Sequence, residues 1–195
     1  MPIDSLVPAA EYALLVVVPV YDHEHAIAEV VAGIRAAGLP CLLVDDGSHA
    51  DCAAVLAVLA RQPGVGLLRL QHNQGKGGAV IAGLREAARR GHSHALQIDA
   101  DGQHDPACIP TLLAKLEEGY DMVVGARDWS GQAGVHRGAA NAFYNWLASR
   151  MTGFDVKDLT SGFRVVRAEK FREFIHLLPN GFSYPTTSTM AFFRS

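Results

Sequence analysis

The sequence has little of what marks several classes of protein. Only three cysteines occur among 195 residues, none in a C-x-x-C pair, and the formal net charge is −3. We interpret the thiols as buried or incidental, as in a reducing compartment. The charge gives no reason to expect nucleic acid as a partner. Nine histidines include the pairs "HEH" and "HSH", but without further ligands at suitable spacing they do not predict a zinc site.

Long apolar runs are also lacking. The stretch "YALLVVVPV" (12–20) is too short to span a membrane and is broken by Pro19. No basic residue precedes Arg35, whereas Asp4 and Glu11 do, so the charged start of a signal peptide is missing. The run therefore predicts a buried strand. We expect a cytoplasmic protein, one that could also lie peripherally on the cytosolic face of the membrane.

Short apolar runs alternate with segments of helical length. The expected strands are 12–19, 41–45, 65–70, 94–99 and 121–125, and the expected helices are 24–37, 50–61, 76–90 and 106–118. Gly38, Gly91 and Gly119 stand where helix C-caps belong. Runs that are apolar on both faces are typical of buried parallel strands. The alternation predicts a doubly wound α/β fold with a mostly parallel sheet flanked by helices, in one domain over 1–195.

The pattern changes after residue 128. A glycine-rich loop (130–138), a helix (139–151), a strand (160–167) and a helix (168–177) are expected, followed by a loop and the start of another helix. The chain thus divides into a first half over 12–128 and a second half over 129–195.

Polar residues collect where the predicted strands end. In open α/β sheets, ligands bind at the carboxyl ends of the strands. The residues expected there are Pro19, Tyr21, Asp22, Asp45, Asp46, His72, Asn73, Lys76, Asp99, Asp101, Arg127 and Asp128. This gathering of polar side chains on one edge predicts a binding site.

The stretch "DADGQ" (99–103) could hold a divalent cation. In an extended segment, Asp99 and Asp101 face the same way, and Gln103 offers a third oxygen. Such sparse oxygen ligation suits Mg²⁺ or Mn²⁺ when a substrate phosphate completes the shell. The plain alternative is an Asp-Gly turn. An EF-hand is excluded because its glycine belongs at position six of the loop.

Two further stretches could contact an anionic ligand. The glycines of "HNQGKGGAV" (72–80) could let backbone N–H groups approach an anion, with Lys76 adding a charge, although a flexible helix start is the alternative. Asp45 or Asp46 could accept hydrogen bonds from a nucleobase or ribose, unless "VDDGS" is only a turn with Ser48 as helix cap. Arg127 and Arg137 flank the glycine-rich loop, which could close over an anionic substrate.

Taken together, these stretches resemble family 2 glycosyltransferases with the GT-A fold, most of all the dolichyl- or polyprenyl-phosphate mannose synthase branch. The resemblance spans roughly residues 14–190. The matching stretches are "VVVPVYDHE", "LLVDDGS", "HNQGKGGAVIAGLREA", "LQIDADGQHDP", "VVGARD" and "DLTSGFRVVR".

The resemblance implies an inverting transfer of a sugar from a nucleoside-diphosphate sugar, such as GDP-mannose or a UDP-hexose, to a lipid phosphate or another membrane-associated acceptor. It places Pro19, Tyr21 and Asp46 in the nucleoside pocket and Lys76 near the base or diphosphate. Asp99 and Asp101 match the family's Asp-x-Asp motif, with Asp101 and Gln103 facing the metal. Arg127 and Arg137 match the positions that hold an acceptor phosphate. The first half would bind the nucleotide sugar and the second half the acceptor.

Several features depart from the family pattern or leave alternatives open. Thr187 stands where members commonly have an acidic residue, and Asn141 where mannose synthases show a hydroxyl residue. Relatives also usually continue with a basic, membrane-contacting C-terminal part, so the chain could be a short form or a truncated one. Arg150, Lys157 and the aromatics of 143–146 could contact anionic lipid, but a packed helix explains the aromatics equally well. A catalytically silent sugar-nucleotide-binding module and, less so, a haloacid-dehalogenase-like phosphatase remain as alternatives.

Overall fold

The computed structural model describes residues 13–126, 145–150, 153, 156–181 and 183–193. Within them, six strands form one sheet in the order β3-β2-β1-β4-β6-β5. The strands are β1 (Leu14–Val20), β2 (Cys41–Asp45), β3 (Val65–Arg69), β4 (His94–Gln97), β5 (Met122–Val124) and β6 (Arg164–Arg167). β1 pairs in parallel with both β2 and β4, and β2 pairs in parallel with β3. The predicted α/β class and mostly parallel sheet are confirmed.

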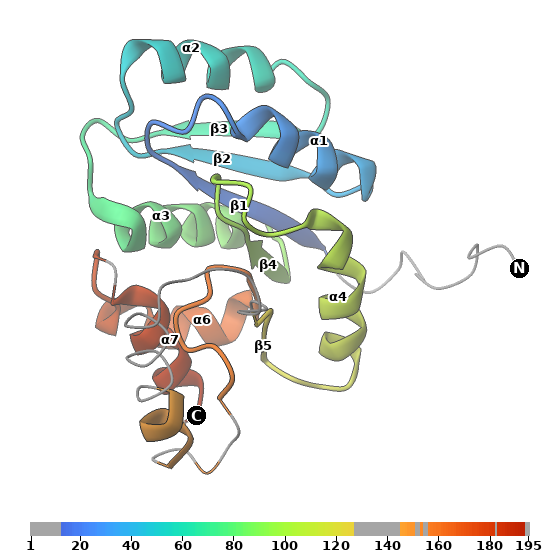
Figure 1. The fold of residues 1–195 in the computed structure, drawn as a ribbon, viewed down its shortest axis with the longest axis vertical. Coiled ribbons are helices and arrows are strands. Elements are labelled where there is room, and N and C mark those ends of the chain that lie inside the picture. The colour runs from blue at the N-terminus through green and yellow to red at the C-terminus, as the bar shows by residue number, and fades with distance from the viewer. Residues whose placement is uncertain (1–12, 127–144, 151–152, 154–155, 182, 194–195) are drawn as a thin grey trace, which may run out of the picture.

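Helices cover both faces of the sheet (Figure 1). They are α1 (Ile27–Ala36), α2 (Ala50–Leu59), α3 (Gly75–Arg89), α4 (Ile109–Glu117), α6 (Ala168–Phe174) and α7 (Tyr184–Phe192), with 3₁₀ turns η1 (Pro106–Cys108) and η2 (Ile175–Leu177). Residues 145–150 are also helical. No helix among the described residues has the length and apolarity that crossing a bilayer requires.

β1 shows why the sheet is buried on both sides. Val16 and Val18 pack with the apolar side chains of α1, α2 and α4, whereas Leu15 and Val17 pack with those of α3, α6 and α7. Successive side chains of a strand point to opposite faces, so an apolar run must be covered twice. The helices end at the predicted glycines: Gly38, Gly91 and Gly119 have φ values of 75°, 80° and 97°, which a side chain would disfavour.

The second half differs in detail from the prediction. β6 begins at Arg164 rather than residue 160, because residues 160–163 form a turn in which the Ser161 hydroxyl donates to the Gly125 carbonyl at 2.6 Å. β6 also lies between β4 and β5 and runs antiparallel to both. The predicted helix over 168–177 is α6 followed by η2. The expected loop 130–138 lies outside the described residues, as does most of the expected helix 139–151.

Candidate functional site

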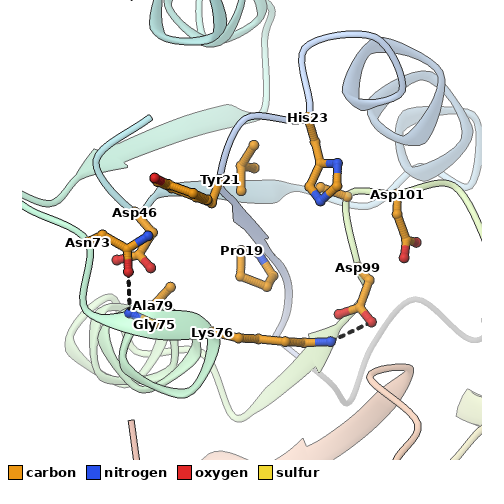
Figure 2. Close-up of a pocket in the computed structure, with 12 residues that line it drawn as sticks. Pro19, Tyr21, His23, Asp46, Asn73, Gly75, Lys76, Ala79, Asp99 and Asp101 are labelled. Atoms are coloured by element: carbon orange, nitrogen blue, oxygen red, sulfur yellow. Dashed lines mark hydrogen bonds and ion pairs between the residues drawn. The ribbon is translucent and has the colours of Figure 1, made fainter. Parts of the chain in front are cut away.

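A cavity of about 440 Å³ lies at the carboxyl ends of β1, β2 and β4, beside the start of α3 (Figure 2). Its position is the one at which open α/β sheets bind ligands. Six residues predicted from the sequence line it: Pro19, Tyr21, Asp46, Lys76, Asp99 and Asp101. Asn73, which was also expected at this edge of the sheet, lines it as well, together with His23, which was not predicted.

The two aspartates after β2 have different surroundings. The Asp45 side chain is buried, accepts a hydrogen bond from the Ser48 N–H at 2.8 Å, and pairs with Arg69 at 3.3 Å. Asp46 instead lines the cavity and accepts from the Gln74 N–H at 2.7 Å. Burial raises the pKa of Asp46, against the opposing effect of this hydrogen bond. The expectation that Asp45 contacts a nucleotide is therefore corrected: it holds the turn that presents Asp46.

The glycines at the start of α3 make room for protein rather than for an anion. The Gly78 N–H donates to the Asn180 carbonyl at 3.0 Å. A Cβ on Gly77 would lie 2.7 Å from the carbonyl carbon of Asn180. The 179–181 loop thus occupies the place where an anion would have to approach the Gly78 N–H. The predicted backbone cradle is corrected in this respect, while the Lys76 side chain extends into the cavity (Figure 2).

Lys76 and Asp99 form an ion pair across the cavity. Lys76 Nζ lies 2.7 Å from Asp99 Oδ2, and the two side chains are 27% and 15% exposed. Gln97 Nε2 donates to the other carboxylate oxygen of Asp99 at 3.4 Å. Asp99 therefore has a protein cation as its partner, which the sequence did not indicate, because the two residues are 23 positions apart.

Asp101 lies beside Asp99 but outside its ion pair with Lys76 (Figure 2). β4 ends at Gln97, and the chain turns at Ala100 and Asp101, so the extended geometry assumed for residues i and i+2 does not apply. The Asp101 carboxylate accepts the Gln103 N–H at 3.0 Å, and Gln103 itself is exposed and outside the cavity lining. Within the described residues, no three His, Cys, Asp or Glu side chains are grouped to hold a metal.

The comparison with known families agrees with this geometry. The sequence profile of glycosyl transferase family 2 matches residues 15–175, which is most of the chain. The chain belongs to glycosyl transferase family 2. Membership removes the phosphatase alternative, and the resemblance found in the sequence is confirmed.

Two relatives in this family are named for the same kind of acceptor. The chain is 32% identical to undecaprenyl-phosphate mannosyltransferase of Micrococcus luteus, over 82% of this chain and 68% of the relative. It is 31% identical to undecaprenyl-phosphate 4-deoxy-4-formamido-L-arabinose transferase of Shewanella sediminis, over 88% of this chain and 56% of the relative. The chain thus spans between about half and two thirds of these curated relatives.

Solved glycosyltransferases share the fold. Glucosyl-3-phosphoglycerate synthase of Mycobacterium tuberculosis, solved with Mn²⁺, uridine diphosphate and phosphoglyceric acid, superposes with a TM-score of 0.68 and 21% identity. The match covers 91% of this chain and 62% of that chain. The architecture is therefore GT-A, as the sequence predicted.

The donor set of this family 2 chain fits a metal that is completed by substrate. Mg²⁺ and Mn²⁺ sites commonly use one or two carboxylates and take further oxygens from substrate phosphates. Asp101 lines the cavity and its carboxylate has a backbone N–H as its described partner. Asp99 is engaged by Lys76. The side chain best placed to hold a metal is therefore Asp101.

The remaining predicted residues lie elsewhere. Arg127 and Arg137 fall outside the described residues, as does Asn141. Thr187 lies on α7, where its hydroxyl donates to the Ser183 carbonyl at 3.2 Å, and it does not line the cavity. His104, beside the acidic stretch, is buried and stacks on Phe163 with ring centroids 5.2 Å apart.

Proposed function

We propose that this chain transfers a sugar from a nucleoside-diphosphate sugar to polyprenyl phosphate, with inversion and with a divalent metal ion. One observation carries the proposal: a single cavity at the carboxyl edge of the sheet brings together Asp46, Lys76 and Asp101. The Asp46 carboxylate suits a ribose or base, the Lys76 ammonium suits a diphosphate, and the Asp101 carboxylate suits a metal ion.

The order of side chains along the cavity supports an orientation for the donor. In Figure 2, Tyr21 lies on the side of Asp46 and Asp101 on the opposite side, with Lys76 crossing between them. We place the nucleoside between Pro19, Tyr21 and Asp46. The diphosphate then lies along Lys76 toward Asp101, so the sugar leaves the cavity near Asp101.

The proposed reaction breaks the bond between the sugar and the diphosphate, so negative charge grows on the leaving nucleoside diphosphate. Lys76 can donate to a phosphate oxygen in addition to Asp99, because an ammonium carries three donors. A bound Mg²⁺ or Mn²⁺ would add charge neutralisation at the same diphosphate. The Lys76 ammonium and the metal ion would both stabilise the leaving diphosphate more strongly as its charge grows. Catalysis requires such a preference for the transition state over the bound substrate.

A polyprenyl phosphate acceptor fits this machinery because its phosphate is already an anionic nucleophile. It needs positioning rather than a general base. This agrees with the threonine at position 187, where the sequence resemblance leads us to expect an acid. We assign the positioning of the acceptor phosphate to Arg127 and Arg137, from the sequence resemblance. A single displacement by that phosphate inverts the configuration at the sugar carbon. The names of the relatives support the acceptor class while differing in the sugar.

The test is calorimetric titration of GDP-mannose and UDP-glucose with and without Mn²⁺. We expect metal-dependent binding of one donor and a loss of about tenfold or more in affinity in Asp101→Asn, equivalent to about 1.4 kcal/mol. Asp51→Asn is the matched control, since Asp51 is exposed on α2 outside the cavity.

Incubation with undecaprenyl phosphate and labelled donor should then yield labelled lipid. The metal assignment would be refuted if Asp101→Asn bound the donor as tightly as wild type and a chelator did not weaken the binding to wild type. Donor binding without any transfer would instead favour the silent binding module.

A further inference from the structure

Arg164, the first residue of β6, is a buried cation with neutral partners. It is 1% exposed. Its guanidinium donates to the Ser161 carbonyl through Nε at 3.1 Å and through Nη2, to the Pro185 carbonyl at 3.0 Å, and to the hydroxyls of Ser188 at 2.6 Å and Thr189 at 3.3 Å. A buried charge is costly unless its donors are satisfied. A buried arginine at position 164 therefore calls for a specific role.

The guanidinium ties a turn to a helix. Two of its bonds reach the Ser161 carbonyl, and the others reach Pro185, Ser188 and Thr189 of α7. Burial lowers the pKa of Arg164, while the charges of Asp99 and Asp158 act in the opposite direction. An arginine stays charged even so. Arg164 thus fixes the Ser161 turn and places positive charge behind the cavity.

The turn in question lies directly against Asp99. A Cβ on Gly162 would lie 2.5 Å from the carboxyl carbon of Asp99 and would overlap both of its oxygens. The Ser161 hydroxyl fixes the turn further, since it donates to the Gly125 carbonyl at 2.6 Å and accepts the Phe163 N–H at 3.1 Å. The backbone at Gly162 is therefore a rigid wall behind the carboxylate.

The same carboxylate contacts Lys76, whose Nζ lies 2.7 Å from Asp99 Oδ2. Asp99 thus has three neighbours around its carboxylate: the Gly162 backbone, the Lys76 ammonium and the Gln97 amide. If the wall moved, the carboxylate would move with it, and the ammonium would lose its fixed position in the cavity.

We propose that Arg164 is a positioning residue that fixes the Ser161–Gly162 turn and thereby the Asp99 carboxylate, which holds the Lys76 ammonium in the donor cavity. Asp99 acts in this arrangement as the anchor of Lys76, and the metal-holding role rests on Asp101. Only the identity of the ligand that Lys76 meets rests on the proposed function. The positioning itself is a property of the protein without ligand.

The first test therefore uses no substrate. The rate at which Lys76 is acetylated by an amine-reactive ester is followed by peptide mass spectrometry in the full chain. In Gly162→Ala the new methyl group displaces the Asp99 carboxylate, so the ammonium becomes mobile and accessible, and we expect a several-fold faster reaction. Lys115, which pairs with Glu118 on α4, serves as the internal reference and should not change.

Two controls make the result specific. Gly181→Ala places a methyl group where no atom lies within 4 Å, and should leave the Lys76 rate unchanged. In an Asp99→Ala background there is no carboxylate to displace, so adding Gly162→Ala should produce no further increase. An unchanged Lys76 rate in folded Gly162→Ala would overturn the proposal, as would equal increments from Gly162→Ala with and without Asp99.

Arg164 is then tested directly. Arg164→Met should raise the Lys76 rate as Gly162→Ala does, and Arg164→Lys should restore part of the slow reaction, because an ammonium can still donate to the Ser161 carbonyl. A lack of any such rescue, with both variants folded by circular dichroism, would count against the proposal. If Arg164→Met does not fold, Arg164→Lys is compared with wild type alone, and an unchanged Lys76 rate in that variant would overturn the role of Arg164.

Donor titration of the same variants separates this inference from the proposed function. Weaker donor binding in Gly162→Ala, with Gly181→Ala unaffected, supports both. A faster Lys76 reaction in Gly162→Ala, together with a wild-type protein that binds no nucleotide sugar, would uphold the positioning and refute the function. Donor binding with an unchanged Lys76 rate in Gly162→Ala would do the reverse.

Discussion

Gly77→Ala should destabilise the protein in the absence of any ligand, because the added methyl group would meet backbone rather than a flexible side chain. The new Cβ would lie 2.7 Å from the carbonyl carbon of Asn180 and would overlap the Pro179 carbonyl oxygen. Overpacking of this kind costs about 1–3 kcal/mol, and backbone neighbours place it toward the upper end.

Two smaller effects act in opposite directions. Moving the loop would weaken the hydrogen bond from Gly78 to Asn180, which contributes about 1 kcal/mol. Alanine is favoured over glycine within a helix by about 1 kcal/mol. These two nearly cancel, so we expect the free energy of unfolding to fall by about 2–3 kcal/mol.

Urea denaturation of the ligand-free protein measures this difference. Gly181→Ala is the matched control, because it adds the same methyl group within the 179–181 loop itself, at a position with no atom within 4 Å. Its free energy of unfolding should stay within about 1 kcal/mol of wild type. If Gly77→Ala were as stable as wild type, or more stable through its helix propensity alone, the loop would not be packed on α3. The glycines would then again be available to an anion.

Three further outcomes follow from buried or paired groups. Cys108 is exposed, whereas burial raises the pKa of Cys41 to about 11, so alkylation at pH 8 followed by mass spectrometry should modify Cys108 and spare Cys41. Hydrogen bonds from Arg89 and Arg90 lower the pKa of Glu86 from its ordinary 4.5 to about 2. Because the folded value is the lower one, the stabilisation is present above pH 4.5 and is lost as the pH falls toward 2. The stability difference between wild type and Glu86→Gln in urea should shrink over that range. Asp46→Ala removes the acceptor of the Gln74 N–H ahead of α3 and should cost about 1 kcal/mol in the same ligand-free assay.

The part of the fold that could be predicted from the sequence is the part set by local pattern. The strands from β1 to β4 are short, mostly apolar runs that alternate with helices, and turn glycines (Gly38, Gly91 and Gly119) follow three of these helices, so run length and turn glycines sufficed. The position of β6 was not predictable in this way. Its pairing with both β4 and β5 depends on contacts across more than 35 residues of chain, which no local signal specifies.

The same division applies to the candidate site. Asp46, Lys76 and Asp101 were predicted because each follows a strand whose end must lie at one edge of the sheet. Which of them binds which neighbour could not be predicted. Asp45 turned inward to Ser48, and Asp99 turned to Lys76, because those choices depend on burial and on distant residues. Arg164 was missed altogether, since a basic residue in "FRVVR" reads as the polar end of a strand.

Two sets of contacts between distant residues meet at the start of α3. The 179–181 loop holds its backbone through Gly78, while the Ser161 turn holds the Lys76 side chain through Asp99. Both supports come from the second half of the chain, although the cavity lining itself lies within residues 19–101. The expected halves 12–128 and 129–195 are therefore joined structurally at this cavity, whichever ligand each of them binds. In the proposed arrangement, a shift of the Ser161 turn would reach Lys76 through the contact of Gly162 with Asp99 and the ion pair of Asp99 with Lys76.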